Sequence, residues 1–189
     1  PYAEQEEVFL AQLSLAARRD LPVSIHCLKS WGRLLELLRE NRKPDRGFLL
    51  HSYGGPAEMV EPLAKLGAYF GFPGYFAHKR KKRHREVFRR VPVDRLLIET
   101  DAPDQTLPEN RVTHPLGQGL NHPANIAAVY EAAAEALGPK TAFVPTTQFA
   151  RPAKESPNVT HGHHWYGNAE SYFFIGDALG QALLKLNDK

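Results

Sequence analysis

Three side chains with metal-ligand chemistry occupy equivalent places in the sequence, each at or just after the end of a short apolar segment. They are His26, His51 and Asp101, separated by 25 and 50 residues. In parallel α/β proteins the carboxyl ends of the strands form the edge at which functional side chains gather. Imidazole nitrogens and carboxylate oxygens suit Zn, Mn and related divalent ions. We therefore predict that these three side chains converge on a metal ion.

Glu99 stands two residues before Asp101, so the two carboxylates share one face of an extended strand. We take Asp101 and Glu99 as the candidate catalytic residues. For Glu99, two other interpretations stay open: a residue that orients a metal ligand, or a buried acid with its own partner. Each histidine has a simpler explanation too, because a single histidine at a strand end is often only a hydrogen-bonded structural residue. Cys27 is interpreted as a small buried residue and not as a nucleophile.

Hydrophobic periodicity predicts the elements that must position these side chains. The expected strands are 23–26, 48–51, 68–72 and 94–100. The expected helices are 4–19, 30–38, 56–66, 80–90 and 123–137. Strict alternation of strands and helices predicts a parallel sheet with helical crossovers. Because a closed barrel needs about eight strands, we predict an α/β fold that is either a partial TIM-type (β/α) barrel or a small open sheet.

Bulk composition fits a soluble globular protein, with 42% hydrophobic and 24% charged residues among 189. No apolar run approaches the ~20 residues that cross a bilayer, so we expect no membrane association. The first residues carry acids and show no secretory signal. A single cysteine allows no intramolecular disulfide, which favours a cytoplasmic location. The chain does not start with methionine, so we expect it to be processed or incomplete at its start.

A dense basic segment follows the third expected strand. Eight of the ten residues at 79–88 are Lys, Arg, His or Glu. The simpler interpretation is a solvated helix face. The alternative is a patch that follows the phosphates of a nucleic acid, in which case binding would depend on salt. The nearby aromatic residues Tyr53, Tyr75 and Phe76 could stack on bases, although such residues are as often part of the core.

Five segments occur in an order that is similar to the TatD family of metal-dependent hydrolases. They are LPVSIH at 21–26, LHSYGG at 50–55, YFGFPGY at 69–75, LLIETDAP at 96–103 and LNHPAN at 120–125. Many members are deoxyribonucleases on a TIM-type barrel. The resemblance implies that His26 and His51 are metal ligands from successive strands. It also implies that Asp101 is both a metal ligand and a proton acceptor, and that Mg, Mn or Zn is the cofactor and DNA or another phosphodiester the substrate.

The resemblance also predicts missing parts. The family pattern begins with a His-x-His pair and continues with a bridging glutamate, and neither is identifiable here. We therefore expect the second half of the barrel only, about half of the metal ligands, weak metal binding and poor turnover. The alternative function is a non-catalytic remnant or fusion product that binds nucleic acid or a protein partner. Open sheet edges would favour self-association.

The last fifty residues change character, and we place a domain boundary so that 1–138 is the TatD-like part and 139–189 a tail. A helix is expected at about 172–186. The tail resembles the C-terminal segment of SGNH-type, sialate O-acetylesterase-like enzymes, in which a histidine precedes the final helix. His164 is the nearest match, and His161 replaces the usual aspartate. Because the nucleophile block of such enzymes is absent, we interpret the tail as non-catalytic and its clustered histidines as adventitious metal binders.

Overall fold

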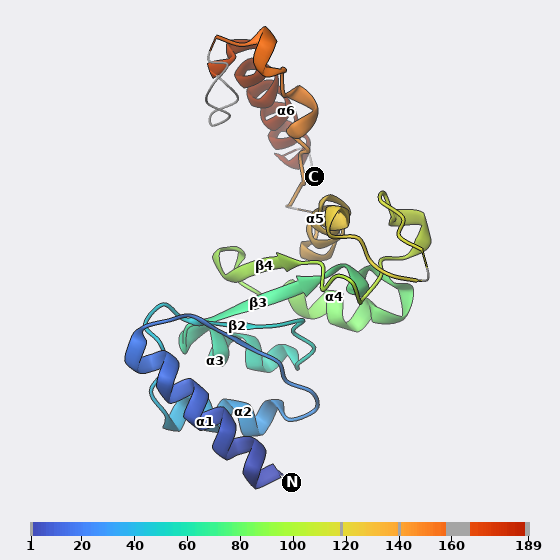
Figure 1. Cartoon of the computed structure of the whole chain (residues 1–189). Coiled ribbons are helices and arrows are strands. Elements are labelled where there is room, and N and C mark those ends of the chain that lie inside the picture. The colour runs from blue at the N-terminus through green and yellow to red at the C-terminus, as the bar shows by residue number, and fades with distance from the viewer. Residues whose placement is uncertain (1, 118, 140, 158–166, 188–189) are drawn as a thin grey trace. The chain divides into compact units, whose positions relative to one another are not determined.

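The chain divides into two compact units, Pro1–Leu137 and Gly138–Lys189, and each is described by itself. The structure, a computed structural model, describes residues 2–117, 119–139, 141–157 and 167–187. Figure 1 shows the whole chain coloured from the N-terminus to the C-terminus. The predicted boundary lies beside the division between the units.

The first unit is built on one parallel sheet. Its strands are β1 Val23–Ile25, β2 Phe48–Leu50, β3 Ala68–Pro73 and β4 Leu96–Glu99. They pair in sequence order, with Ile25 beside Leu50, Leu50 beside Phe70, and Phe70 beside Leu96. Each pair of consecutive strands is joined by a helical crossover, which confirms the predicted α/β class and partial TIM-type barrel. The sheet of four strands is not closed.

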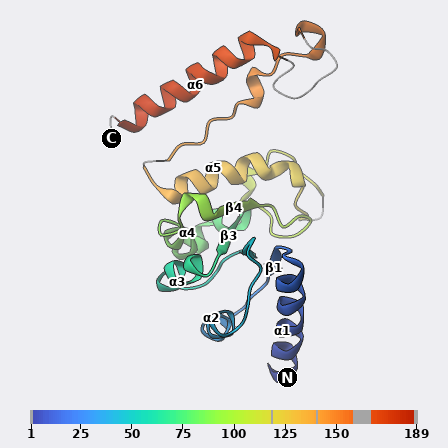
Figure 2. The same ribbon diagram turned by 90° about the vertical axis from the view of Figure 1, so that its left-hand side faces the viewer.

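Helices connect these strands and cover the sheet. The longer ones are α1 Tyr2–Arg19, α2 Trp31–Glu40, α3 Val60–Lys65, α4 Lys82–Phe88 and α5 Ile126–Leu137. Short 3₁₀ turns are η1 Ala57–Met59, η2 Gly74–Ala77, η3 Lys79–Lys81, η4 Val93–Arg95, η5 Glu109–Arg111 and η6 Pro123–Asn125. Figure 2 shows α2, α3 and α4 following one another along one side of the strands. Because the strands are parallel, the side chains at their carboxyl ends share one edge of the sheet, which we call the rim.

Several predicted element boundaries differ from the structure. The expected helix at 80–90 is a 3₁₀ turn followed by the shorter α4, and residues 94–95 belong to a 3₁₀ turn before β4. The helices predicted to open at Pro56 and Pro123 also begin as 3₁₀ turns. A proline has no N–H to donate and its ring fixes φ, so it suits the first turn without requiring α geometry there.

The core of the first unit lies between the sheet and its helices. Its largest fully buried side chains include Phe48, Phe70, Phe72 and Phe88, each at most 1% exposed. Phe72 contacts Phe88 edge to face, with ring centroids 4.9 Å apart. Because protein interiors are close-packed, this aromatic core holds the strands beneath the rim in fixed positions.

The second unit is organised around α6 Ala169–Asn187, which is longer than the predicted helix. Short 3₁₀ turns, η7 Thr147–Phe149 and η8 Ala153–Glu155, precede it. His161 and His164, which carried the esterase-like interpretation, lie outside the described residues. No helix in the described ranges is long and apolar enough to cross a membrane.

Candidate metal site at the sheet rim

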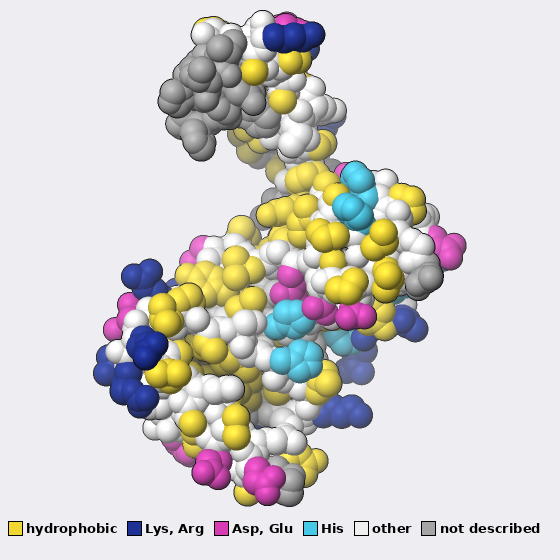
Figure 3. Space-filling model, viewed as in Figure 1, with side chains coloured by type: hydrophobic (Ala, Val, Ile, Leu, Met, Phe, Trp, Pro, Cys, Tyr) yellow, Lys and Arg dark blue, Asp and Glu magenta, His cyan; other side chains and the backbone are white. Residues whose placement is uncertain are grey.

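The three predicted ligands stand on the same rim. His26 directly follows β1, His51 directly follows β2, and Asp101 comes two residues after β4. Because the strands are parallel and in register, their carboxyl ends meet at one edge. On the face shown in Figure 3, histidine and acidic side chains gather side by side.

His51 and Asp101 are in direct contact. The Nε2 atom of His51 lies 3.0 Å from Oδ1 of Asp101 and 3.8 Å from Oε1 of Glu99. The three side chains are partly shielded, since the exposed fractions are 22% for His51, 30% for Asp101 and 15% for Glu99. The two carboxylates and the imidazole form a compact cluster of groups of the kind that bind a divalent cation.

His26 lies beside this pair, next to the ring of His51. Its ring centroid is 5.6 Å from that of His51, and the two planes are tilted by 40°. Within the described residues, no group of three or more His, Cys, Asp and Glu side chains is arranged to hold a metal ion. The structure thus brings His51 and Asp101 together, with His26 adjacent, and does not form a three-ligand cage.

The donor set nevertheless fits a divalent ion in kind. Ligand atoms at about 2.0–2.1 Å from a tetrahedral Zn²⁺ are about 3.3 Å from each other. The 3.0 Å between His51 Nε2 and Asp101 Oδ1 is close to that separation. His51 and Asp101 could therefore share one ion, with His26 beside them.

Glu99 is held in place by its neighbours. Its Oε1 atom accepts hydrogen bonds from the backbone N–H of Ser52 at 2.6 Å and from the Ser52 hydroxyl at 2.8 Å. The carboxylate lies over Gly71 of β3, where an added Cβ would come within 2.5 Å of Oε2. These contacts tie the end of β4 to the residue after His51. They favour the interpretation of Glu99 as a residue that positions the site.

Three polar residues of the site were missed by sequence reasoning. Gln105 donates its side-chain amide to Oδ2 of Asp101 and, at 3.2 Å, to the hydroxyl of Ser52. The buried Asn121 donates to the carbonyl of Thr100 at 2.8 Å. The signals were weak: Ser52 adjoins His51, and Asn121 belongs to one of the five family-like segments, but no spacing rule places Gln105 at Asp101.

The backbone is strained at the strand ends that carry the site. Lys29, Ser52, Asp101 and Gln105 all have left-handed φ angles, between 46° and 59°. Non-glycine residues seldom adopt this conformation, and it concentrates at functional sites. At Asp101 it turns the chain sharply after β4.

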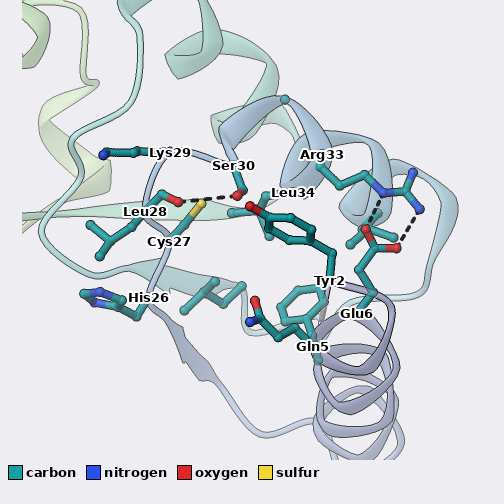
Figure 4. Close-up of a pocket in the computed structure, with 14 residues that line it drawn as sticks. Tyr2, Gln5, Glu6, His26, Cys27, Leu28, Lys29, Ser30, Arg33 and Leu34 are labelled. Carbon is teal, nitrogen blue, oxygen red and sulfur yellow. Dashed lines mark hydrogen bonds and ion pairs between the residues drawn. The ribbon is translucent and has the colours of Figure 1, made fainter.

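A cavity of about 730 Å³ opens beside His26, between the start of α1 and the loop after β1. Figure 4 shows Tyr2 at its centre, and Arg33 paired with Glu6 along one wall. The Arg33 guanidinium donates to both Glu6 oxygens at 2.8 Å, and this hydrogen bonding lowers the pKa of Glu6. Cys27 also lines the cavity, and burial raises the pKa of its thiol. The cavity thus gives His26 a solvent-accessible side.

Two of the aromatic residues considered for base stacking belong to the core. Tyr53 is fully buried and donates its hydroxyl to the carbonyl of Pro56 at 2.8 Å. Phe76 is 4% exposed. Tyr75 contacts the cations of Arg80 and Lys81, 5.1 and 4.8 Å from its ring centroid. The stacking hypothesis is therefore wrong for Tyr53 and Phe76, because their rings are buried in the core and cannot reach a base.

Parallel strands with helical crossovers, and polar side chains at the carboxyl ends of those strands, place the chain in the TIM-type α/β class. A family model described as TatD related DNase matches residues 1–150. The chain belongs to this family.

Named relatives and solved structures agree with that assignment. The chain is 34% identical over 131 residues to "Uncharacterized metal-dependent hydrolase YabD" of Bacillus subtilis, covering 69% of this chain and 49% of YabD. It is 34% identical over 142 residues to "3'-5' ssDNA/RNA exonuclease TatD" of Klebsiella pneumoniae, covering 75% of this chain and 53% of that protein. The crystal structure of YjjV, a TatD homologue from Escherichia coli K12, matches with a TM-score of 0.58 and 31% identity, covering 66% of this chain and 46% of YjjV. The chain therefore spans about half the length of the curated relatives it matches.

Proposed function

We propose that this chain supplies half of a divalent-metal site that hydrolyses phosphodiester bonds of DNA, with His26, His51 and Asp101 as ligands. The contact between His51 and Asp101 at the shared rim carries the proposal. The relatives named metal-dependent hydrolase and ssDNA/RNA exonuclease support the reaction class and a nucleic-acid substrate. Mg, Mn and Zn are the candidate ions.

A bound divalent ion would lower the pKa of a coordinated water and offset the charge that builds on phosphoryl oxygens. The residues of this chain supply the rest. Asp101 accepts the proton that the attacking water loses, because its carboxylate is 30% exposed and reaches solvent. Gln105 donates to the second oxygen of Asp101 and so fixes the plane of the carboxylate.

Glu99 positions the site in this proposal, without contacting the substrate. Its carboxylate holds the backbone of Ser52, and Ser52 directly follows His51 in the chain. The imidazole of His51 therefore keeps its orientation toward Asp101. Removing a residue that orients a metal ligand typically lowers metal affinity or activity by about 10- to 100-fold.

The proposal is tested with labelled single-stranded DNA and RNA in the presence of Mg²⁺, Mn²⁺ or Zn²⁺. We expect metal-dependent cleavage to be slow, and Asp101→Asn and His51→Ala to lower it by about 100-fold or more. Asp94→Asn removes an acid that is 79% exposed and serves as the matched control. Equal cleavage by the wild type and both site variants would contradict the metal mechanism.

Calorimetric titration measures the metal site without any substrate. Because His51 and Asp101 are in direct contact and His26 lies only beside them, we expect weak binding that Asp101→Asn and His26→Ala weaken further. Tight binding of two ions per chain would contradict the view that the ligand set is incomplete.

A non-catalytic remnant that binds nucleic acid is the second candidate function. The basic segment at 79–85 favours it. Nucleic-acid binding with no metal-stimulated cleavage would select it. The esterase-like tail and self-association through β1 and β4 stay predictions, since the family match ends at residue 150.

A further inference from the structure

The positive charge of the chain is concentrated in the segment 79–95. Nine of these seventeen residues are Lys or Arg and two are acidic, a net charge of +7, whereas the whole chain carries +3. The remaining residues therefore carry a net charge of −4. A local field of this kind attracts anionic partners to one place on the surface.

A cleft of about 880 Å³ lies where this segment begins. We call it the basic cleft. Its charged lining residues are Lys79, Arg80, Arg85, Arg111, Glu109 and Glu135. The volume is in the range of sites that hold a ligand of nucleotide size.

Three of the four cations of the basic cleft have no ion pair among the described residues: Lys79, Arg80 and Arg85. The fourth, Arg111, is neutralised by Glu135 at 2.6 Å. Glu109 is the one other acid in the lining. The cleft thus holds an excess of two positive charges.

Neutral groups of the protein hold two of these cations in place. Arg85 is half-buried and donates to the backbone carbonyls of Phe76 and His78. Arg80 donates to the hydroxyl of Tyr75 at 2.6 Å. Carbonyl and hydroxyl oxygens orient a guanidinium without cancelling its charge, so the field stays available to a ligand.

The basic cleft is joined to the candidate metal site by one loop. The ring of His78, which lines the cleft, lies 2.9 Å from the carbonyl of Thr106 through its Nε2 atom. Gln105, the residue before Thr106, donates to Asp101. The cleft and Asp101 are therefore connected through two consecutive residues of this loop, Gln105 and Thr106.

We propose that the basic cleft binds a phosphate of a nucleic-acid strand next to the phosphate at the metal site. This inference rests on the proposed function for the choice of nucleic acid as the ligand, but it is tested by binding measurements alone. The Tyr75 ring is covered by Arg80 and Lys81, so the contact is to the phosphate, with no stacking on a base. The cleft therefore grips DNA and RNA independently of sequence, as phosphate contacts do. A concave site of this volume fits a single strand and not a flat lipid surface.

The test is anisotropy of a labelled dT₁₂ strand with the full chain in EDTA, between 50 and 200 mM NaCl. The double variant Lys79→Gln/Arg80→Gln is expected to weaken binding about three- to tenfold and to reduce the salt slope by about 0.7 for the one phosphate lost. Both side chains are exposed, so the fold is preserved, which thermal unfolding verifies.

The matched control is Arg39→Gln, which removes an exposed arginine of α2 that has no ion pair in the described part of the chain. We expect it to leave affinity and slope nearly unchanged. Equal losses in Arg39→Gln and the double variant, or no loss in either, would overturn the proposal.

Strand binding in EDTA and metal-stimulated cleavage separate this inference from the proposed function. If metal-stimulated cleavage were absent while the double variant still lost affinity, the proposed hydrolysis would fail and the phosphate contact would stand.

Discussion

The two units of the chain are stabilised by different kinds of side chain. The first unit buries a continuous apolar cluster under its sheet, with Phe70, Phe72 and Leu50 completely inaccessible. In the described part of the second unit, the buried side chains are the polar Asn168 and Ser171. The candidate site therefore stands on the part of the chain with the larger hydrophobic stabilisation.

Polar contacts organise the second unit instead. Asn168 donates to the carbonyl of Glu155 at 3.1 Å and accepts from the N–H of Ser171 at 3.0 Å. Arg151 pairs with Glu170 at 2.8 Å. On α6, large apolar residues such as Phe173 and Leu183 are at least 60% exposed. Such a unit gains about 1 kcal/mol per net hydrogen bond, so we expect it to open before the first unit does.

Removing a core ring gives the largest expected effect. Phe70→Ala should lower the free energy of unfolding by about 3–5 kcal/mol, because the cavity at a fully buried position cannot collapse completely. Phe174→Ala, in the half-exposed stack on Phe149, should cost about 1 kcal/mol or less. Hydrogen exchange read by mass spectrometry assigns each loss to its unit. Similar losses at both positions would break the contrast between the units.

Adding one methyl group tests the contact that joins the core to the site. In Gly71→Ala the new Cβ would meet the Glu99 carboxylate within 2.5–2.8 Å, so we expect a loss of about 1–3 kcal/mol. Gly32→Ala is the control: it has no neighbour within 4 Å, and helix propensity should make it neutral or stabilising by up to about 1 kcal/mol. Urea unfolding compares the two, and a stable Gly71→Ala would show that Glu99 can move freely.

Ser171→Ala probes the polar organisation of the tail. Its hydroxyl accepts from the N–H of Arg151 at 3.2 Å, and loss of that acceptor should cost about 1 kcal/mol. We expect faster amide exchange at 151–157 and 167–175 and no change in 2–137. Faster exchange in the first unit as well would mean that the two units unfold together.

The smallest expected effect is a pH dependence at His84. Burial, and then the charges of Lys81 and Arg83, lower the pKa of this imidazole, and its Nδ1 atom is buried without a partner. The unfolded chain, with an ordinary pKa of about 6.5, then binds a proton more readily than the folded one. Stability should fall as pH drops below about 6.5.

His84→Gln should flatten this dependence. Melting temperatures at pH 7.5 and 5.0 give the comparison for wild type and variant. The same decrease in both proteins would assign the effect to other groups.

Periodicity and strand-end positions were enough to predict the sheet. The segments 23–25 and 48–50 favour a strand over a helix, because each is short, contains residues that favour strands and is bounded by turn residues. The histidine that follows each run was therefore placed correctly at the rim. The predicted helix boundaries near Pro56, Lys79 and Pro123 differ from the structure, since local sequence does not separate a 3₁₀ turn from the first turn of a helix.

Side-chain partnerships were beyond the reach of the sequence. Nothing in the spacing of Gly71, Ser52 and Glu99 indicates that these residues meet, because they come from β3, the loop after β2 and the end of β4. Tyr53 shows the same limit of prediction from sequence. Its ring belongs to the core, although its place close after His51 suggested a role at the rim. Such contacts depend on how crossovers bring strands together, which is a property of the whole sheet.

The left-handed backbone at Asp101 restricts how this position can change. Asparagine and glycine tolerate that conformation best, and either follows from an aspartate codon by a single base change. Both remove the carboxylate. Random mutation selected only for a well-folded product would therefore favour replacements that remove the proposed metal ligand, so libraries at this codon need an activity screen from the first round.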